Sequence, residues 1–214
     1  MPSGKEMAMR IVAVALIGAL LALAACAPTA QRRGARALDE QSQAPSAQAA
    51  RWGYVGGKMV TRPDAAVKNT QDKAIYLNEH YSMTAYRIPV ANGAYAVKLH
   101  FAETYEGIKD VGQRVFSVAI EGKTVLSDFD VFKEAGRERF AAVVKEFQVE
   151  VRDGELTIEF TPKVQNPEIN GIELRAVHKG KPHGAALLIN CGASADYEAK
   201  DGRIWRKDQE YQAP

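Results

Sequence analysis

The chain has 214 residues, of which 46% are hydrophobic and 25% are charged, the composition of a soluble globular domain with an additional segment. Its formal net charge is +2, and Lys and Arg are spread along the sequence without a long basic run. Composition therefore gives no electrostatic support for binding to nucleic acid or to an anionic membrane surface.

The N-terminus has the pattern of a secretory signal. Lys5 and Arg10 precede an uncharged apolar run, residues 11–25, that is short for a membrane-spanning helix. The run stops at Cys26 in a motif that resembles the bacterial lipobox, which implies cleavage before this cysteine and its lipidation. We expect residues 1–25 to be a lipoprotein signal peptide. An ordinary signal peptide with an incidental cysteine is the alternative.

The segment that follows, residues 26–50, has almost no large apolar side chain. It cannot bury enough surface to offset chain entropy, and we expect a disordered tether from the lipidated Cys26. Ala27 stands where an aspartate is associated with inner-membrane retention. The expected location is therefore the bacterial cell envelope, lipid-anchored, at the outer membrane if the bacterium has two membranes.

The folded domain is expected over residues 51–214, a length that suffices for a core. Asn92-Gly93 is predicted to be a tight turn that opens the most regular strand, 95–101. There Tyr95, Val97, Leu99 and Phe101 alternate with smaller or polar side chains. The strand leads into a loop, residues 103–107, which carries an aromatic side chain and two carboxylates.

Shorter strands account for most of the remaining chain. They are predicted at 86–90, 115–120, 124–126, 143–151, 156–160, 169–177 and 187–190. Glu121-Gly122 is predicted to be a turn, Asp153-Gly154 a hairpin, and residues 131–139 a short helical turn. Many short strands without a sustained helical period favour an all-β fold, an antiparallel β-sandwich or jelly roll.

The chain offers no recognisable catalytic set. Cys191 has no histidine beside it and is expected to be a small buried residue. Asp128 and Asp130 lie on one short loop, which favours a cap for the following turn over a glycosidase pair. The four histidines show no metal-ligand spacing. We therefore expect no enzymatic activity, no metal and no cofactor.

Several stretches resemble the malectin family of carbohydrate-binding domains, and they follow in the order of that family. These stretches are 52–57, 99–105, 114–118, 128–131, 153–160 and 166–174. The elements with which the family normally opens occur last here, in 189–192, 201–205 and 208–211. The resemblance implies a malectin-like sandwich with a displaced opening segment.

Three explanations for the displacement are open. The domain is circularly permuted, with residues 51–177 as main body and 185–214 as the first-strand segment, or that segment is exchanged in a swapped homodimer, or the chain is a fragment that enters a second repeat. We favour permutation, because residues 179–184 make a plausible linker and an unpaired opening strand would expose Trp205.

The resemblance also implies a ligand site on loops. The tyrosines of the family match Tyr54, Tyr81 and Tyr105, while its phenylalanine and aspartate positions hold Glu106 and Gln165, the latter beside Asn166. Aromatic rings stack on sugar faces, and the other side chains hydrogen-bond to hydroxyls. Tyr54, between glycines, is expected to be exposed, whereas Tyr81 is equally compatible with a place in the core.

These features together imply a membrane-tethered, non-catalytic module that recognises a glucan or envelope glycan by tyrosine stacking and hydroxyl hydrogen bonds. The expected partners are a glucose-containing oligosaccharide or other envelope glycan and, through the lipid anchor, a membrane. The alternative is a protein- or peptide-binding scaffold of the cell envelope on the same fold.

Overall fold

The computed structural model describes residues 52–213. The expected signal peptide, the tether and Cys26 lie outside these residues. Within the described part, no helix is long and apolar enough to cross a membrane.

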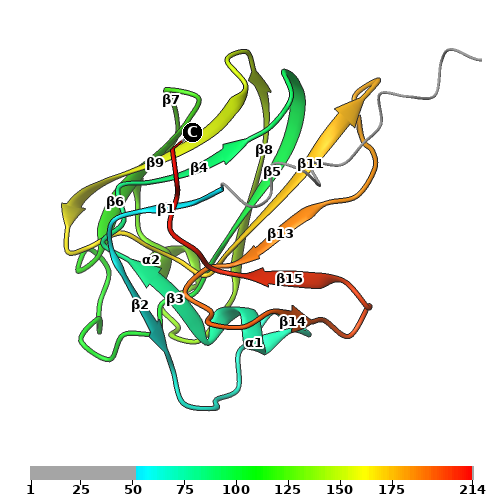
Figure 1. Ribbon diagram of the computed structural model, residues 1–214. Coiled ribbons are helices and arrows are strands. Elements are labelled where there is room, and N and C mark those ends of the chain that lie inside the picture. Colours follow the sequence, from blue (N-terminus) through cyan, green and yellow to red (C-terminus); the bar gives the residue numbers. More distant parts are fainter. Residues whose placement is uncertain (1–51, 214) are drawn as a thin grey trace, which may run out of the picture. The chain divides into compact units, whose positions relative to one another are not determined.

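Two large sheets and a small third sheet make up the domain (Figure 1), and all strand pairs are antiparallel except β13 with β15. The five-stranded sheet has the order β1 (Gly53–Val55), β4 (Ala85–Pro89), β9 (Glu155–Val164), β6 (Val115–Ile120) and β7 (Lys123–Phe129). The seven-stranded sheet has the order β14 (Tyr197–Glu198), β15 (Ile204–Lys207), β13 (Leu187–Asn190), β11 (Gly171–His178), β5 (Gly93–Phe101) and β8 (Val143–Val151), with β12 (Lys181–Pro182) paired to β11. The small sheet has the order β10 (Glu168–Ile169), β3 (Asn78–Tyr81) and β2 (Lys58–Thr61).

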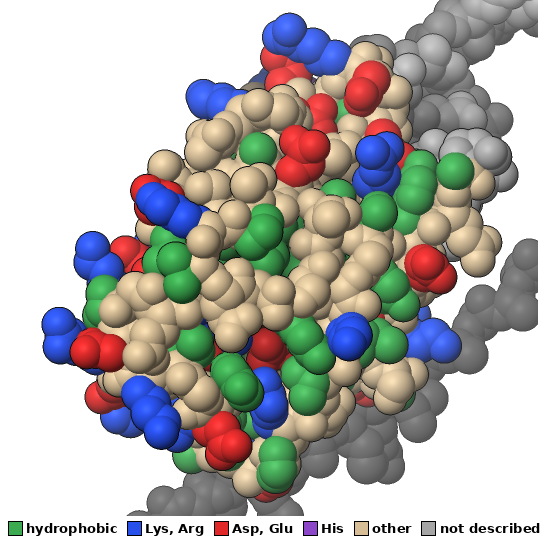
Figure 2. Space-filling view, turned by 90° about the vertical axis from the view of Figure 1, so that its left-hand side faces the viewer, with side chains coloured by type: hydrophobic (Ala, Val, Ile, Leu, Met, Phe, Trp, Pro, Cys, Tyr) green, Lys and Arg blue, Asp and Glu red, His purple; other side chains and the backbone are tan. Residues whose placement is uncertain are grey.

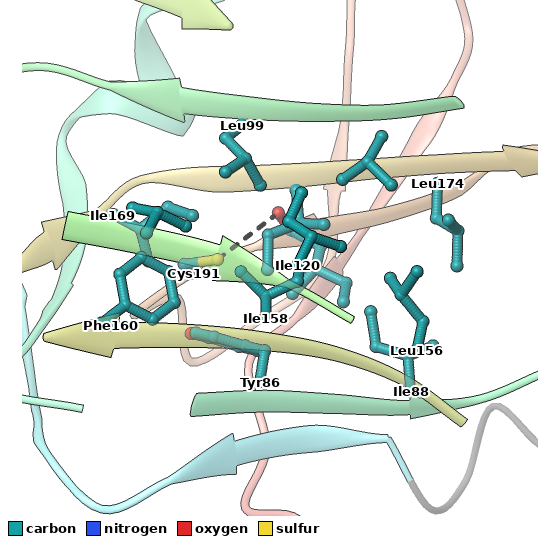
Figure 3. Close-up of a cluster of buried hydrophobic side chains, with 14 of the residues drawn as sticks. Tyr86, Ile88, Leu99, Ile120, Leu156, Ile158, Phe160, Ile169, Leu174 and Cys191 are labelled. Carbon is teal, nitrogen blue, oxygen red and sulfur yellow. Dashed lines mark hydrogen bonds between the residues drawn. The ribbon is translucent and has the colours of Figure 1, made fainter. Parts of the chain in front are cut away.

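The core lies between the two large sheets (Figure 3). Leu99 and Leu174 project from the seven-stranded sheet toward Tyr86, Leu156 and Ile158 of the five-stranded sheet. Each of these side chains is at most 2% exposed. The expected all-β sandwich is confirmed, and the period-two pattern of 95–101 is the core face of β5.

The connection at Asp153-Gly154 is not the predicted hairpin. β8 pairs with β5, whereas β9 pairs with β4 and β6, so the turn carries the chain from one sheet to the other. Asn92 lies at the earlier crossing, where the chain passes from β4 in the five-stranded sheet to β5 in the seven-stranded sheet. Its amide accepts a hydrogen bond from Gly154 N and donates one to the Arg152 carbonyl, which ties the two crossings together.

The two helices are single turns, α1 (Lys73–Tyr76) and α2 (Val131–Glu134). Asp130 is the N-cap of α2, and its side chain accepts a hydrogen bond from Lys133 N. This confirms the predicted cap for Asp130. Asp128 does not cap the helix and pairs instead with Lys163, with 2.7 Å between the charged atoms.

The C-terminal segment packs on its own chain. β13 pairs with β11, and the side chains of Ile189, Cys191 and Trp205 are at most 1% exposed. Figure 1 shows the last residues, in red, running beside β1. Backbone hydrogen bonds join Tyr54 N to the Gln209 carbonyl and Tyr211 N to the Tyr54 carbonyl.

Asp208 fixes this segment to the body of the domain. Its carboxylate oxygen Oδ2 accepts hydrogen bonds from Tyr86 Oη and Gly192 N, and lies 2.8 Å from His80 Nδ1. The second ring nitrogen of His80 lies 3.0 Å from the Gly56 carbonyl oxygen. The buried polar atoms of Tyr86 and His80 have this carboxylate as a partner only when the C-terminal segment is in place.

Candidate functional site

A cavity of about 300 Å³ opens where the small sheet meets the loops that follow β5 and β9. It is lined by Val60, Arg62, Glu79, Tyr81, Tyr105, Arg114, Gln165 and Asn166. Figure 2 shows the side of the molecule that carries β2 and β6 on the left of Figure 1. Most charged side chains lie around the edge of this face, and hydrophobic ones are scattered over its centre among backbone and other side chains.

The register of the small sheet supplies one wall. Val60 pairs with Glu79 across β2 and β3, and Glu168 of β10 pairs with Tyr81. Directly opposed residues in antiparallel strands point to the same face, and so do residues two apart in one strand. Val60, Glu79, Tyr81 and Glu168 therefore share the face that is turned toward the cavity.

The opposite wall is the loop after β5, and a buried ion pair holds it. Glu103 is fully buried, and its Oε1 accepts a hydrogen bond from Tyr105 N. Arg114 donates from Nε and Nη2 to the two oxygens of Glu103, and from Nη1 to the Asn166 carbonyl. Arg114 thus fixes the Tyr105 loop and the Asn166 loop relative to each other.

Tyr105 is the most exposed aromatic side chain on the cavity wall, at 40%. A Cβ atom at Gly107 would clash with its ring. Glycine at this position therefore lets the ring lie back over its own loop.

A second polar group joins the two walls. Arg62 donates from Nε to Thr104 Oγ1 at 2.9 Å and from Nη2 to Glu79 Oε2 at 3.1 Å. Thr104 also donates to Glu79 Oε2. The guanidinium carbon of Arg62 lies 6.0 Å from the centre of the Tyr105 ring. Arg62 thus stands between a buried carboxylate and the exposed aromatic ring.

Burial dominates the electrostatics beneath the cavity. It raises the pKa of Glu168 well above the usual value of 4.5, and the nearby Glu79 raises this pKa further. Neither carboxyl oxygen of Glu168 has a hydrogen-bond partner among residues 52–213. Burial also raises the pKa of Glu103, against the opposing effect of Arg114. Burial without a partner therefore favours the neutral form of the Glu168 side chain.

The structure brings together four of the six side chains predicted for the site. Tyr81, Tyr105, Gln165 and Asn166 all line the cavity, whereas Glu106 is exposed outside its lining.

Tyr54 also lies outside the lining and is half-buried rather than exposed. Its ring centre is 4.2 Å from that of His80, and its edge packs on Tyr86. His80 alternates with Glu79 and Tyr81, so Tyr54 packs on the other face of β3. The glycines around Tyr54 do not expose it, because β1 is held between β4 and the C-terminal residues.

Four cavity residues were not predicted from the sequence: Val60, Arg62, Glu79 and Arg114. Glu79 lies two residues before Tyr81, and in a strand this spacing puts both on one face. Arg114 begins a stretch that carries the family resemblance. Nothing in the sequence around Arg62 distinguishes it from a solvated surface residue.

Fold and cavity together define a β-sandwich ligand-binding module with an aromatic-rimmed, polar site. The Malectin domain family matches residues 29–183, and the chain therefore belongs to this family. Among the described residues, no group of three or more His, Cys, Asp or Glu side chains is placed to hold a metal ion.

Curated relatives include Malectin-A of Xenopus laevis, which is 29% identical over 136 residues, 60% of this chain and 46% of that protein. A probable LRR receptor-like serine/threonine-protein kinase of Arabidopsis thaliana is 31% identical over 112 residues, 49% of this chain and 12% of the kinase. The chain thus spans less than half the length of either relative.

Similar solved structures come from an enzyme and a receptor. A Bacteroides uniformis beta-glucuronidase aligns with a TM-score of 0.54 at 26% identity, over 59% of this chain and 14% of the enzyme chain. The plant receptor-like kinase ANX1 aligns with a TM-score of 0.53 at 19% identity, over 64% of this chain and 44% of that chain. The likeness to ANX1 concerns the fold alone.

Proposed function

We propose that this chain is a non-catalytic carbohydrate-binding module. The observation that carries the proposal is the cavity with Tyr81 and Tyr105 on its walls and the amides of Gln165 and Asn166 beside them. A neutral sugar offers apolar C–H faces and hydroxyls, and aromatic rings with a few amides match both. The volume of about 300 Å³ is at the small end of the range for ligand pockets, which suits one or two sugar rings.

We assign stacking to the two tyrosines and hydroxyl hydrogen bonds to Gln165 and Asn166. A glucan or envelope glycan remains the proposed ligand class, supported by the resemblance to malectin. Tyr54 and Glu106 lie outside the cavity lining, so a ligand that fills only the cavity is assigned no contact with them.

We also propose that the module is tethered to a membrane of a bacterial cell envelope. Support comes from the sequence, in which the apolar run 11–25 ends at Cys26. Metabolic labelling with a palmitate analogue tests this proposal. Label that is incorporated by the chain and lost in Cys26→Ala supports the anchor, and label that persists in the variant contradicts it.

A protein- or peptide-binding scaffold is the second candidate. The observation in its favour is the sequence similarity to a probable LRR receptor-like serine/threonine-protein kinase of Arabidopsis thaliana. This candidate predicts capture of a protein partner that neither added sugar nor loss of Tyr105 affects.

A glycan array probed with the full chain in detergent separates the candidates. We expect a discrete glucan or envelope-glycan signal that falls about tenfold in Tyr105→Ala, because the variant removes a stacking surface. Tyr197→Ala is the control, since Tyr197 is a half-buried tyrosine of β14 that bonds to Asp72 away from the cavity. A blank array from folded protein would contradict carbohydrate binding and favour the scaffold.

A further inference from the structure

The cavity presents a hydrogen-bond donor and an acceptor side by side, and both have unused capacity. Arg62 uses Nε and Nη2 for Thr104 and Glu79, and no described residue accepts from its Nη1. Glu79 receives its hydrogen bonds on Oε2, and no described residue donates to its Oε1. Both side chains line the cavity.

In the Arg62–Glu79 pair, the glutamate is buried and the arginine is partly accessible. The Glu79 side chain is 2% exposed, whereas that of Arg62 is 22% exposed. The Tyr105 ring lies beside the guanidinium, 6.0 Å from its carbon atom. A ligand that stacks on Tyr105 therefore comes within reach of the free edge of Arg62.

The charges around the pair are already compensated. Arg114 gives its hydrogen bonds to Glu103 and to the Asn166 carbonyl, and Arg62 is paired with Glu79. The two arginines thus face two carboxylates, so no positive charge is left over for an anionic ligand.

We propose that Arg62 and Glu79 are the specificity-determining pair of the site and that they recognise two adjacent hydroxyls of a neutral sugar. One hydroxyl donates to Glu79 Oε1, and its neighbour accepts from Arg62 Nη1. A carboxylate or sulfate in the same place has no proton to donate to Glu79 and is repelled by it. The site thus selects neutral over acidic sugars. This inference rests on the proposed carbohydrate-binding function.

Titration calorimetry of the full chain with matched sugars tests the inference. The probes are the glucose disaccharides of each linkage, their monodeoxy analogues, and their counterparts that carry a sulfate on one ring hydroxyl. For a disaccharide that binds, we expect a loss of about tenfold to a hundredfold when either of two adjacent hydroxyls is removed, because each is hydrogen-bonded to a charged group. The counterpart with a sulfate on either of these two hydroxyls is expected to bind at least about tenfold more weakly.

Two variants assign these effects to the pair. Arg62→Met is expected to weaken binding about tenfold or more, and one of the two deoxy analogues then loses nothing further. Glu79→Gln keeps an acceptor oxygen and removes the charge, so the preference for the neutral sugar is expected to shrink.

Arg87→Met is the matched control. Arg87 also pairs with a glutamate at 3.1 Å, Glu155, and also stands near a tyrosine ring, that of Tyr211 at 5.7 Å. It lies on β4, outside the cavity lining, and its loss is expected to leave sugar binding unchanged.

The possible results distinguish the role of the Arg62–Glu79 pair from carbohydrate binding itself. A sugar sulfated at either of the two hydroxyls that binds as tightly as its neutral counterpart, or affinity that Arg62→Met leaves unchanged, overturns the role of the pair but not carbohydrate binding. No binding to any disaccharide by folded protein overturns the proposed function itself, and the role of the pair with it.

Discussion

At the scale of single residues, the most unusual feature is the presence of two fully buried glutamate side chains beneath the cavity. Glu103 and Glu168 are both fully buried, and only Glu103 has an arginine bonded to it. A carboxylate without partners is costly to bury, so burial favours the neutral acid form of Glu168. In that form the group needs no counter-charge next to Glu79.

Glu168→Gln is expected to change how stability depends on pH. The pKa of Glu168 is raised in the folded state, so between 4.5 and that higher pKa the folded protein holds a proton that the unfolded chain releases. The free energy of unfolding of the wild type therefore falls as pH rises through this window, by up to about 1.4 kcal/mol per pH unit. Glutamine does not titrate, and the variant lacks this fall.

Urea denaturation at several pH values above 4.5 measures the difference. We expect the stability of the variant relative to the wild type to rise steadily with pH. A difference that stays constant over this range contradicts a neutral Glu168.

Arg114 is a positioning residue on the same scale. Arg114→Met leaves Glu103 buried without its partner, and we expect a loss of about 3 kcal/mol in the free energy of unfolding. Arg206→Met is the control, because the Arg206–Asp196 pair is exposed and such pairs contribute little. Equal losses in the two variants would contradict the role assigned to Arg114.

At the scale of elements, the longer strands follow from the sequence, whereas the short strands β1, β2, β3, β12, β14 and β15 were not predicted. The period-two patterns of 95–101 and 115–120 predict both the strands and their buried faces, and β5 and β6 confirm them. The sheet that each strand joins does not follow. A turn such as Asp153-Gly154 has the same chemistry whether it closes a hairpin or crosses between sheets, and the choice depends on pairing with distant strands.

The residues of the candidate site were also predicted only in part. The resemblance predicts Tyr81, Tyr105, Gln165 and Asn166, which reach one cavity from separate elements. It does not predict Arg62, because the partners of Arg62 are distant in sequence. The half-burial of Tyr54 does not follow from its flanking glycines, because the burial of β1 depends on chain segments far along the sequence.

Asp208 joins the C-terminal elements to the rest of the sandwich. Asp208→Ala leaves Tyr86 Oη and a nitrogen of His80 buried without their partner, and we expect a loss of about 3 kcal/mol or more in the free energy of unfolding. Asp196→Ala, at an exposed ion pair, is the control and is expected to cost less than about 1 kcal/mol. Thermal and urea denaturation compare the two, and a small effect at Asp208 would contradict its role.

At the scale of the whole molecule, the C-terminal segment completes the core of its own chain through β13 and Trp205. A permuted domain makes this pairing within one chain and a swapped dimer makes it between two chains, and we propose the permuted domain. We expect light scattering to give the mass of one chain, 23.4 kDa before any processing or lipidation. A stable dimer that dissociates only on unfolding would favour exchange of the segment.

Hydrogen exchange with and without sugar tests the central claim most directly, because it locates the ligand as well as detecting it. With a disaccharide selected on the array, we predict slower amide exchange in residues 79–81, 104–106 and 165–166 and unchanged exchange in residues 196–206. Protection confined to other segments, or none at a saturating concentration of sugar, would contradict the assignment of the cavity as a carbohydrate site.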